Sequence, residues 1–413
     1  MEEAKFVAMV RGIGGRVFLV GGWVRDMLRG AEAQDKDYVV SGLTEKQFCG
    51  LFPDAKKVGR SFPVYLTEID GKSCEVAFAR RERKTGAGYT GFTAEFSPET
   101  TIEEDLWRRD TTMNSMAMEL PEKTIIDPYH GREDIEARQI RAVSRHFTED
   151  PVRALRAARQ SAQLNFMIAE DTYAYLRACR EELAGEPQER LLHEFTLALA
   201  APRPSIFFRS LQRAGLLETA FPEIHALLGK TQPTEFHPEG DAFEHVMKIA
   251  DEVSAATDDL CVRFCGLCHD LGKGMTPMDM LPHHYGHEER GLAALAAWDR
   301  RCALPKDWRQ AAAFIIAEHM RAPRLEKPGK IVDLLLAIHH SHLDFDGFRS
   351  IIRADHGSLP DYLEYGEQYL DALLRVSGRD CPSGLNGEAV GKWLRTERIR
   401  CFLEARKEIC RES

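Results

Sequence analysis

Hydrophobic and polar residues near the start of the chain follow the pattern of a strand, a tight turn and a helix. Val17 to Val20 form an apolar run, Gly21 and Gly22 follow, and a mixed pattern typical of a short helix begins at Trp23. A second apolar run ends at Val40 and is preceded by the triplet Asp-Lys-Asp. We expect two strands joined by a helix, with the glycines and the aspartates at the strand ends.

The next segment continues this α/β pattern. It predicts a helix near residues 45–51 and strands near residues 63–69 and 73–79, with an antiparallel part. Alternation in the last strand places Glu75 on the face opposite its apolar neighbours, where it could meet the aspartates of the preceding strand. A third carboxylate and a solvated edge residue are both compatible with that position.

The segment from Arg80 to Thr93 is basic, rich in glycine and without helical or strand periodicity. We expect a loop that can move and whose charges can meet phosphates, the alternative being a solvated hairpin tip.

From about Gln139 onward the apolar spacing is helical. Glu149-Asp150-Pro151 has the acids and the early proline that favour a helix start. A stretch with prolines and glycines, residues 229–240, separates these helices from a further helical region.

Composition limits the possible functions of the chain. Its 413 residues allow two to four domains, and 44% hydrophobic residues is ordinary for a globular protein. No stretch approaches the roughly 20 apolar residues of a membrane span, and no signal peptide is evident, so we expect a cytoplasmic protein without a membrane partner. The net charge of −10 argues against nucleic acid binding over the whole surface. A local basic groove remains possible, and its candidates are Arg138, Arg141, Arg145, Arg153, Arg156 and Arg159.

The cysteines do not form a disulfide or zinc framework. There are ten in the chain, and Cys261, Cys265 and Cys268 recur at helical spacing beside apolar residues. That spacing predicts a packed helix face.

The first strand–turn–helix unit has the composition of a phosphate and metal site. Glycines at the turn let a triphosphate approach the backbone N–H groups at the start of the helix. Asp35 and Asp37 lie two residues apart at a strand start, so their carboxylates share a face with Cα atoms about 7 Å apart. Such a pair can hold the Mg²⁺ ions of a two-metal phosphoryl-transfer site.

A second set of candidate metal ligands lies in the later helical region. His245, the pair His269-Asp270 and Asp355 supply nitrogen and oxygen ligands that suit a divalent transition metal. The sequence leaves open which of four further histidines joins them: His283, His284, His287 or His319.

These motifs together resemble the bacterial multifunctional CCA-adding enzymes, which are class II tRNA nucleotidyltransferases of the polymerase-beta superfamily with a C-terminal HD region. The resemblance covers nearly the whole chain and rests on the order of the motifs Gly21-Gly22-x-Val24-Arg25-Asp26, Asp35-x-Asp37, Arg108-Arg109-Asp110 with Asn114, Glu149-Asp150-x-x-Arg153 and the histidine set.

The resemblance implies an α+β protein. It would have a polymerase-beta-type nucleotidyltransferase head (1–138), an all-α neck and body (139–228), an all-α HD domain (229–357) and a helical tail (358–413). Its activity would be template-independent addition of C, C and A to the 3′ end of tRNA from CTP and ATP. The HD domain would add a phosphatase and 2′,3′-cyclic phosphodiesterase activity with a divalent transition metal, for which Ni²⁺ is a candidate. The partner would be the acceptor arm of tRNA, with the enzyme a monomer or homodimer.

The resemblance also implies roles for individual residues. In the head these are Mg²⁺ binding by Asp35 and Asp37 with Glu75 as third acid, and nucleotide contacts by Gly22, Arg25 and Arg109. In the neck and body, Asp150 and Arg153 would read the base, with Arg156 and Arg159 on its phosphate or base. In the HD region the metal ligands would be His245, His269, Asp270 and Asp355. The chemistry of the base-reading pair agrees: a guanidinium donates to cytosine O2 and N3 or adenine N1, and a carboxylate accepts from the exocyclic amine that both bases carry. At i and i+3 of one helix, the two side chains would share a face.

Four alternative functions are weighed against complete CCA addition. A poly(A) polymerase would share the first half but is not expected to carry the HD region. A CC-only or A-only enzyme stays open, although the basic loop favours complete addition because a mobile loop can reshape the pocket between C and A. A nucleotide-transferring signalling protein with an HD domain would be expected to have C-terminal sensing domains, for which the tail after Asp355 is too short. A non-catalytic tRNA-binding module would not need the retained acids.

Overall fold

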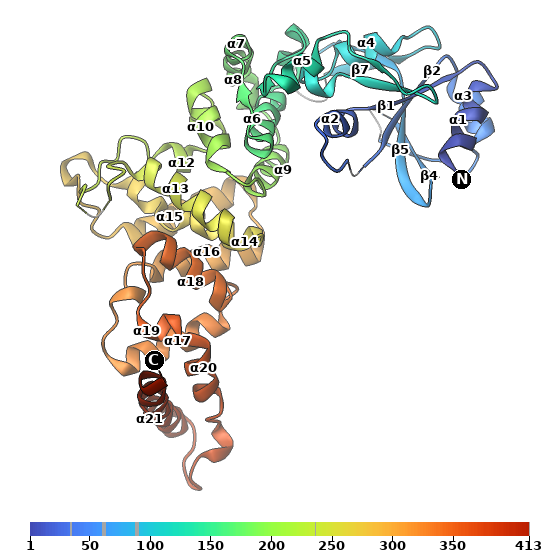
Figure 1. Ribbon diagram of the computed structural model, residues 1–413. Helices are drawn as coiled ribbons and strands as arrows, with labels where there is room; N and C mark the ends of the chain where they lie inside the picture. Colours follow the sequence, from blue (N-terminus) through green and yellow to red (C-terminus); the bar gives the residue numbers. More distant parts are fainter. Residues whose placement is uncertain (34, 60–62, 87–90, 236, 413) are drawn as a thin grey trace. The chain divides into compact units, whose positions relative to one another are not determined.

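The computed structural model describes residues 1–33, 35–59, 63–86, 91–235 and 237–412, and its contacts divide the chain into two compact units (Figure 1). The first unit contains residues 1–198 and 206–220, and the second contains residues 199–205 and 221–413. Within the described residues, no helix combines the length and the apolar character needed to cross a membrane.

A mixed seven-stranded sheet forms the centre of the first unit, in the order β3-β4-β5-β2-β1-β8-β9. Strands β2 and β5 run parallel, whereas every other neighbouring pair of this sheet is antiparallel. The strands are β1 (Arg16–Val20), β2 (Asp37–Ser41), β3 (Lys56–Val58), β4 (Val64–Ile69), β5 (Lys72–Phe78), β8 (Ala117–Leu120) and β9 (Thr124–Ile126). The predicted α+β head with an antiparallel part is therefore confirmed.

Both faces of the central strand β1 are covered, which explains its continuous apolar run. Val17 and Leu19 pack into one hydrophobic cluster, while Phe18 and Val20 pack into another on the opposite face. The first cluster includes side chains from α1 (Glu3–Arg11), α2 (Gly22–Leu28) and α3 (Glu45–Leu51). The second includes side chains from α4 (Ile102–Trp107).

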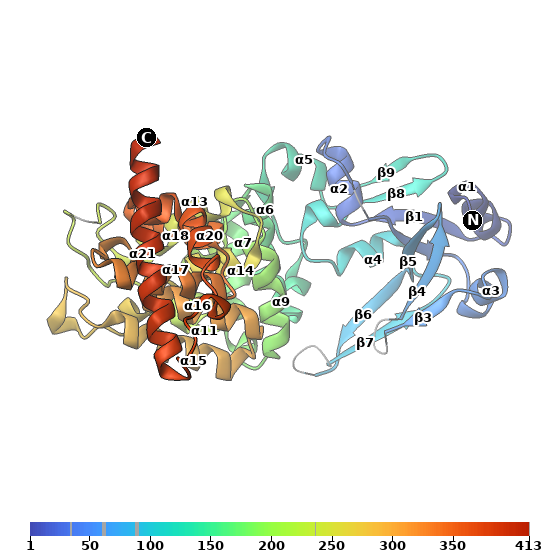
Figure 2. The same ribbon diagram turned by 90° about the horizontal axis from the view of Figure 1, so that it is seen from below.

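Residues 80–84 and 92–96 pair as two antiparallel strands, which corrects the expectation of an irregular loop. These strands are β6 (Arg80–Lys84) and β7 (Phe92–Phe96), and residues 87–90 between them lie outside the described residues (Figure 2). The buried positions of β6 are charged. Arg80 and Glu82 form an ion pair, and their side chains are only 11% and 6% exposed. An ion pair in place of apolar residues is why the sequence shows no strand alternation here.

The remainder of the first unit is mainly helical, as the spacing after Gln139 predicted. Its elements are η1 (Thr112–Asn114), α5 (Gly131–Glu136), β10 (Gln139–Ile140), η2 (Arg145–Glu149), α6 (Val152–Leu164), β11 (Met167–Ile168), α7 (Glu170–Ala178), α8 (Arg180–Leu183), α9 (Gln188–Leu199), α10 (Ser205–Ala214) and α11 (Leu217–Ala220). Nine residues of α6 are buried, which makes it the packed centre of this part.

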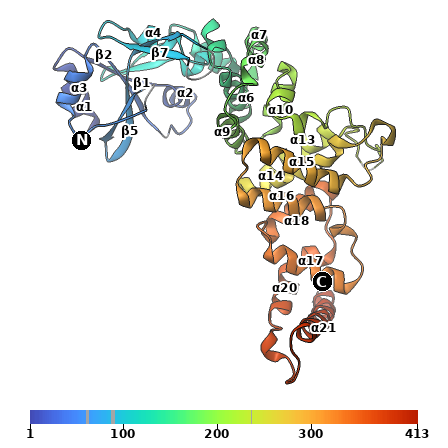
Figure 3. The same ribbon diagram turned by 180° about the vertical axis from the view of Figure 1, so that it is seen from behind.

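The named secondary-structure elements in the described residues of the second unit are all helices. Helices α13, α14, α16 and α18 pack together, α15 packs on η3 and α16, and α17, α20 and α21 form a group of their own (Figures 2 and 3). The elements are α12 (Pro222–His225), α13 (Ala242–Ala256), α14 (Leu260–Cys268), η3 (Leu271–Met275), η4 (Met278–Met280), α15 (His287–Cys302), α16 (Lys306–Glu318), η5 (Ala322–Arg324), α17 (Pro328–His340), α18 (Phe345–His356), α19 (Asp361–Glu364), α20 (Gly366–Leu374), η6 (Gly378–Asp380) and α21 (Glu388–Glu412). Cys265 and Cys268 are buried in α14 with Cys261 partly buried, consistent with the predicted packed face.

A glycine contact holds η3 against α15. A Cβ on Gly272 would lie 1.8 Å from the His287 carbonyl oxygen and 2.4 Å from the Gly291 nitrogen. Both are backbone atoms, so relief would require the two elements to separate.

We therefore expect Gly272→Ala to lower the free energy of unfolding of the second unit by about 3 kcal/mol, the scale of an overpacked core. Gly391→Ala in α21 is the matched control, because a Cβ there meets nothing within 4 Å. Urea unfolding followed by circular dichroism measures both, and equal stabilities of the two variants would contradict the packing argument.

Candidate active sites

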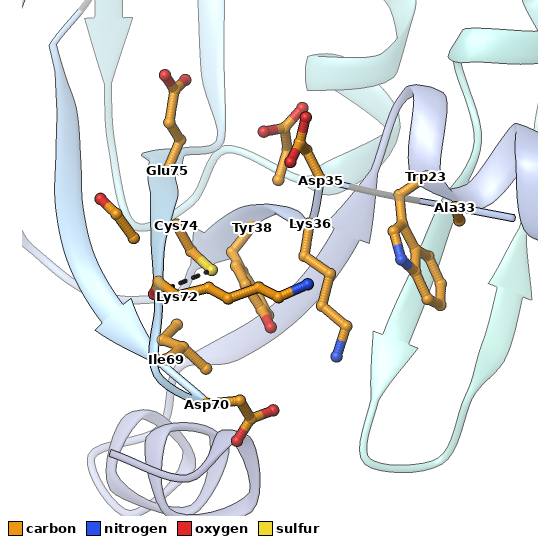
Figure 4. Close-up of a pocket in the computed structure, with 12 residues that line it drawn as sticks. Trp23, Ala33, Asp35, Lys36, Tyr38, Ile69, Asp70, Lys72, Cys74 and Glu75 are labelled. Atoms are coloured by element: carbon orange, nitrogen blue, oxygen red, sulfur yellow. Dashed lines mark hydrogen bonds between the residues drawn. The ribbon is translucent and has the colours of Figure 1, made fainter.

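Three carboxylates come together at the end of the central sheet. Asp37 opens β2 and is the register partner of Glu75 in the parallel strand β5, so their Cα atoms are about 4.8 Å apart. Asp35 lies two residues before Asp37, just outside the strand. All three line one cavity of about 610 Å³ (Figure 4). The structure thus brings Glu75 beside the predicted pair.

Electrostatics at this cluster favour a bound cation. Burial raises the pKa of Asp37, and the nearby charges of Glu75 and Asp35 raise it further, while Arg109 works in the opposite direction. Three carboxylates at this spacing repel one another. A divalent cation between them would relieve that repulsion, so the donor set fits Mg²⁺.

The glycine turn gives arginines close access to the backbone. Gly21 has φ of +70°, a left-handed conformation that favours glycine, and a Cβ there would lie 3.4 Å from a guanidinium nitrogen of Arg109. A Cβ on Gly22 would lie 3.5 Å from Arg25. Arg25 itself donates to Asp26 and, at 2.9 Å, to Asn114 Oδ1. Gly22, Arg25 and Arg109 therefore lie around one turn, as the motif order suggested.

Asp105 orients the arginine motif and was missed by the sequence analysis. Its carboxylate accepts from Arg108 at 2.7 Å and from Arg109 at 3.1 Å, and it is completely buried. Arg108 also donates to Glu82 of β6 at 2.9 Å. The i−3 and i−4 spacing of Asp105 from the two arginines was a signal in the sequence that could have identified it.

Asp110 is a second buried carboxylate with several donors. It accepts hydrogen bonds from the Thr111 N–H at 2.7 Å, Gln160 Nε2 at 3.1 Å and Asn114 Nδ2 at 3.3 Å, and pairs with Arg156 at 3.2 Å. Burial alone would raise its pKa, but Arg156 and these donors lower the pKa of Asp110 to about 2. Asp110 therefore ties α6, which carries Arg156, to the arginine motif.

Asp150 lies outside the helix on which it was expected. Its backbone is extended and α6 begins at Val152, because Asp150 acts as a local cap whose Oδ1 accepts from the Val152 N–H at 3.2 Å. Oδ2 accepts from Arg190 of α9 at 2.9 Å, a partner that the sequence did not suggest. Arg153 is buried and donates to the His146 carbonyl oxygen at 2.6 Å.

Most of the predicted basic groove consists of paired arginines. Arg141 donates to Asp134 and Asp171, and Arg159 donates to Glu194. With Arg153 and Arg156 also engaged, the exposed members of the set are Arg138 and Arg145. A continuous row of free cations is therefore not formed.

The predicted HD residues meet in the second unit. His245 of α13 has its Nε2 3.1 Å from Asp355 Oδ1 of α18 and 3.6 Å from Asp270 Oδ2. His269 has its Nε2 3.3 Å from Asp270 Oδ2 and 3.8 Å from Asp355 Oδ1. These four side chains are nearly completely buried.

Two of the four undecided histidines join this cluster from the other side of Asp270. The Nε2 atoms of His287 and His319 lie 3.2 and 3.4 Å from Asp270 Oδ1 and 3.2 Å from each other. His284 instead contacts Thr276 and the Thr231 carbonyl, and His283 stacks on Tyr285.

The cluster has the features of a metal centre. Nδ1 of His269, His287 and His319 each lies within hydrogen-bond distance of a backbone carbonyl, so each Nε2 is free to act as a ligand. His269 Nε2 and Asp270 Oδ1 are buried without a hydrogen-bond partner among the described residues. Although burial opposes it, the Lys273 ammonium and His269 hold the pKa of Asp270 well below its usual range. The donors fit one or two divalent transition metals.

Three known family models match successive parts of the chain. Residues 17–141 match the poly A polymerase head domain, residues 165–228 match the probable RNA and SrmB-binding site of polymerase A, and residues 242–365 match the HD domain.

Relatives match over most of the chain. A multifunctional CCA protein of Nitrosococcus oceani is 38% identical over 405 residues, covering 94% of this chain and 98% of its own. One from Mannheimia succiniciproducens is 42% identical over 316 residues, 74% of each chain.

Solved structures share the fold. The CCA-adding enzyme of Bacillus stearothermophilus in complex with CTP aligns with a TM-score of 0.67 at 24% identity, covering 99% of this chain and 98% of its own. The Thermotoga maritima CCA-adding enzyme complexed with tRNA aligns with a TM-score of 0.60 at 18% identity, covering 98% and 94%.

Asp110 should make the first unit sensitive to acid. Its folded pKa lies below the unfolded value, so its stabilisation is present above about pH 4 and is lost as the pH falls toward 2. At neutral pH, Asp110→Asn leaves Arg156 without its carboxylate and should lower the free energy of unfolding by about 3 kcal/mol.

Between pH 6 and pH 3, the stability difference between wild type and Asp110→Asn should shrink by about 1 kcal/mol. Urea unfolding at both pH values measures it, with Asp54→Asn, an exposed position, as the control. A difference that does not change with pH would be contrary to this assignment.

Proposed function

Since this chain belongs to the family of the multifunctional CCA proteins, we propose roles in CCA synthesis for the residues of its two sites. The chain is a CCA-adding tRNA nucleotidyltransferase whose partners are tRNA, CTP and ATP. We assign the nucleotidyltransferase head to residues 1–138, the neck and body to 139–228, the HD domain to 229–357 and the tail to 358–413.

The acid cluster of the head is the transfer site. Asp35, Asp37 and Glu75 would hold Mg²⁺, and the in-register pairing of Asp37 with Glu75 is the observation that carries this assignment. When bound, Mg²⁺ neutralises charge on the α-phosphate and lowers the pKa of the attacking hydroxyl. Gly22, Arg25 and Arg109 hold the triphosphate, supported by their positions around the Gly21 turn.

The transfer is an in-line displacement at the α-phosphorus. The 3′-oxygen of the tRNA forms a bond to this phosphorus, the bond to the bridging oxygen of the β-phosphate breaks, and pyrophosphate leaves. The proton of the hydroxyl is lost to solvent. The arginines orient the leaving group, because Asp105 fixes Arg108 and Arg109 before the nucleotide arrives.

Asp150 and Arg153 select the base. The carboxylate accepts from the exocyclic amine of C or A, and the guanidinium donates to the ring acceptors of either base. Uracil and guanine present a donor where Arg153 also donates, so they are rejected. Arg190 holds Asp150 from a second helix, and Asp110 holds Arg156 alongside. The base-reading groups are thus anchored before binding.

The HD site is a metal-dependent phosphohydrolase that acts on phosphate monoesters and 2′,3′-cyclic phosphates of RNA ends. His245, His269, Asp270 and Asp355 would hold one divalent transition metal, with Ni²⁺ a candidate, and Asp270, His287 and His319 would hold a second. A metal there supplies a water of lowered pKa and binds a phosphate oxygen. His269 Nε2 and Asp270 Oδ1, which are buried and have no hydrogen-bond partner among the described residues, support this role.

The two activities should be separable by mutation. Asp35→Ala should slow CMP and AMP incorporation into tRNA by about 100- to 1,000-fold, the usual loss for one electrostatic group of an active site. Hydrolysis of bis(p-nitrophenyl) phosphate by the HD site should be unchanged in this variant.

His269→Ala should give the opposite result and should also lower the transition metal bound per chain, measured by mass spectrometry. His340→Ala, an exposed histidine at the end of α17, is its control. Loss of both activities in either variant would count against two independent sites.

Arg153→Ala should weaken base choice. The ratio of kcat/KM for CTP to that for UTP should fall by about 10- to 100-fold, the worth of one well-placed recognition pair. This ratio separates a reading role from a merely structural one, because general misfolding lowers both values together. Arg177→Ala, exposed on α7, is the matched control. Unaltered rejection of UTP and GTP by Arg153→Ala would rule out base reading by Arg153.

A further inference from the structure

The four histidines of the HD cluster are not all oriented in the same way. Nδ1 of His269, His287 and His319 lies 2.7, 2.9 and 3.1 Å from a backbone carbonyl oxygen. His245 differs, because its Nδ1 is buried and has no hydrogen-bond partner among the described residues. The backbone therefore sets the tautomer of three rings and leaves that of His245 to another group.

Metal binding by His245 requires an acceptor beside this nitrogen. Its Nε2 faces Asp355 and Asp270, at 3.1 and 3.6 Å, so Nε2 is the atom that would bind the metal. A neutral imidazole that binds a metal through Nε2 carries its proton on Nδ1, which then is a donor. A buried N–H without an acceptor is costly.

Glu239 is placed to be that acceptor. Its Oε2 lies 4.0 Å from His245 Nδ1, and this oxygen is likewise buried without a hydrogen-bond partner in the described parts of the chain. The other oxygen, Oε1, accepts from the Lys248 ammonium at 2.7 Å. Lys248 follows His245 by three residues on α13, so this bond holds the carboxylate against the face that carries the imidazole. A movement of about 1 Å would bring Oε2 within hydrogen-bond distance of Nδ1.

The turn before α13 holds Glu239 beside the helix. Gly240 has φ of +71°, a left-handed conformation that favours glycine, and its N–H donates to the His237 carbonyl oxygen at 2.9 Å. The side chain of Asp241 then caps α13. The stretch of residues 229–240, which was expected to separate two helical regions, therefore also places a carboxylate beside the HD cluster.

We propose that Glu239 is a positioning residue of the HD site, which accepts a hydrogen bond from His245 Nδ1 and so directs Nε2 to the metal. The inference rests on the proposed metal role of His245 and identifies the group that orients this ligand. A carboxylate behind a metal-binding imidazole fixes the ring orientation and makes the ligating nitrogen more basic. Glu239 does not bind the metal in this arrangement, because Lys248 and His245 engage its two oxygens.

The same residues allow a competing arrangement with a different outcome. One ligand atom each from His237, Glu239 and His245 lies within 4.8 Å of the other two, so the three could hold a cation of their own. His245 would then bind a metal at each nitrogen, which requires the loss of both ring protons. Positioning by Glu239 needs only a neutral ring and is therefore favoured.

Ni²⁺ binding to the full chain tests the proposal, with excess Mg²⁺ present to occupy the acid cluster of the head. Glu239→Ala should raise the Kd of one bound Ni²⁺ by about 10- to 100-fold, the usual effect of removing such a partner. The number of ions bound at saturation should not change. Glu239→Gln keeps an oxygen that can accept from Nδ1 and should restore much of the affinity. Glu252→Gln, which alters an exposed acid of the same helix, is the matched control and should bind Ni²⁺ as wild type does.

Thermal unfolding distinguishes positioning from a purely structural role. Without added metal, Glu239→Ala and wild type should have nearly the same Tm, because the ion pair with the half-exposed Lys248 contributes little. Added Ni²⁺ should raise the Tm of wild type more than that of the variant. An equal loss of Tm with and without Ni²⁺ would overturn the proposal.

Two results of the binding measurement would also overturn it. One is a Kd of Glu239→Ala equal to that of wild type. The other is the loss of one bound Ni²⁺ in both Glu239→Ala and His237→Ala, which would make these residues ligands of a separate ion. If wild type itself bound no Ni²⁺, the proposed function of the HD site would fail and not this inference alone.

Discussion

Two buried carboxylates, Asp105 and Asp110, hold in place the arginines on which the nucleotide site depends. Asp105 accepts from Arg108 and Arg109, and Asp110 pairs with Arg156 and accepts from Asn114, which also receives a hydrogen bond from Arg25. Buried charges of this kind are tolerated only when each has partners. Here the partners are the groups that would meet the triphosphate and the base, so the structure fixes their positions before substrate binds.

The HD cluster follows the same principle. Asp270 is buried among the Nε2 atoms of His269, His287 and His319 and the ammonium of Lys273. Each imidazole is oriented by a backbone carbonyl at its other nitrogen, which leaves its Nε2 lone pair available near the Asp270 carboxylate. In both sites, a carboxylate that is difficult to bury organises the surrounding cations or ligands.

The sequence predicted best those features that depend on a local hydrophobic periodicity or on a single motif. Alternation placed Glu75 on the correct face, but its pairing with Asp37 depends on two strands that are separated along the chain, and periodicity carries no information about such a partner. The strand that begins at Arg80 was not predicted, because its buried side chains, Arg80 and Glu82, form an ion pair and so give no apolar alternation. Asp150 was expected on the helix and instead caps it. Several arginines of the predicted basic groove pair with acids distant in sequence, such as Arg159 with Glu194, and the local pattern carries no information about such partners.

Nucleotide incorporation into tRNA truncated at each of its three terminal positions measures the central claim most directly. With CTP and ATP both present, the wild-type protein should add C, C and A to the shortest tRNA, C and A to the next, and A alone to the last, then stop. One site with an acidic cluster and an anchored Asp150–Arg153 pair is expected to admit both bases and to exclude UTP and GTP. Addition of C only, addition of A only, or continued growth of an A tract would contradict the account.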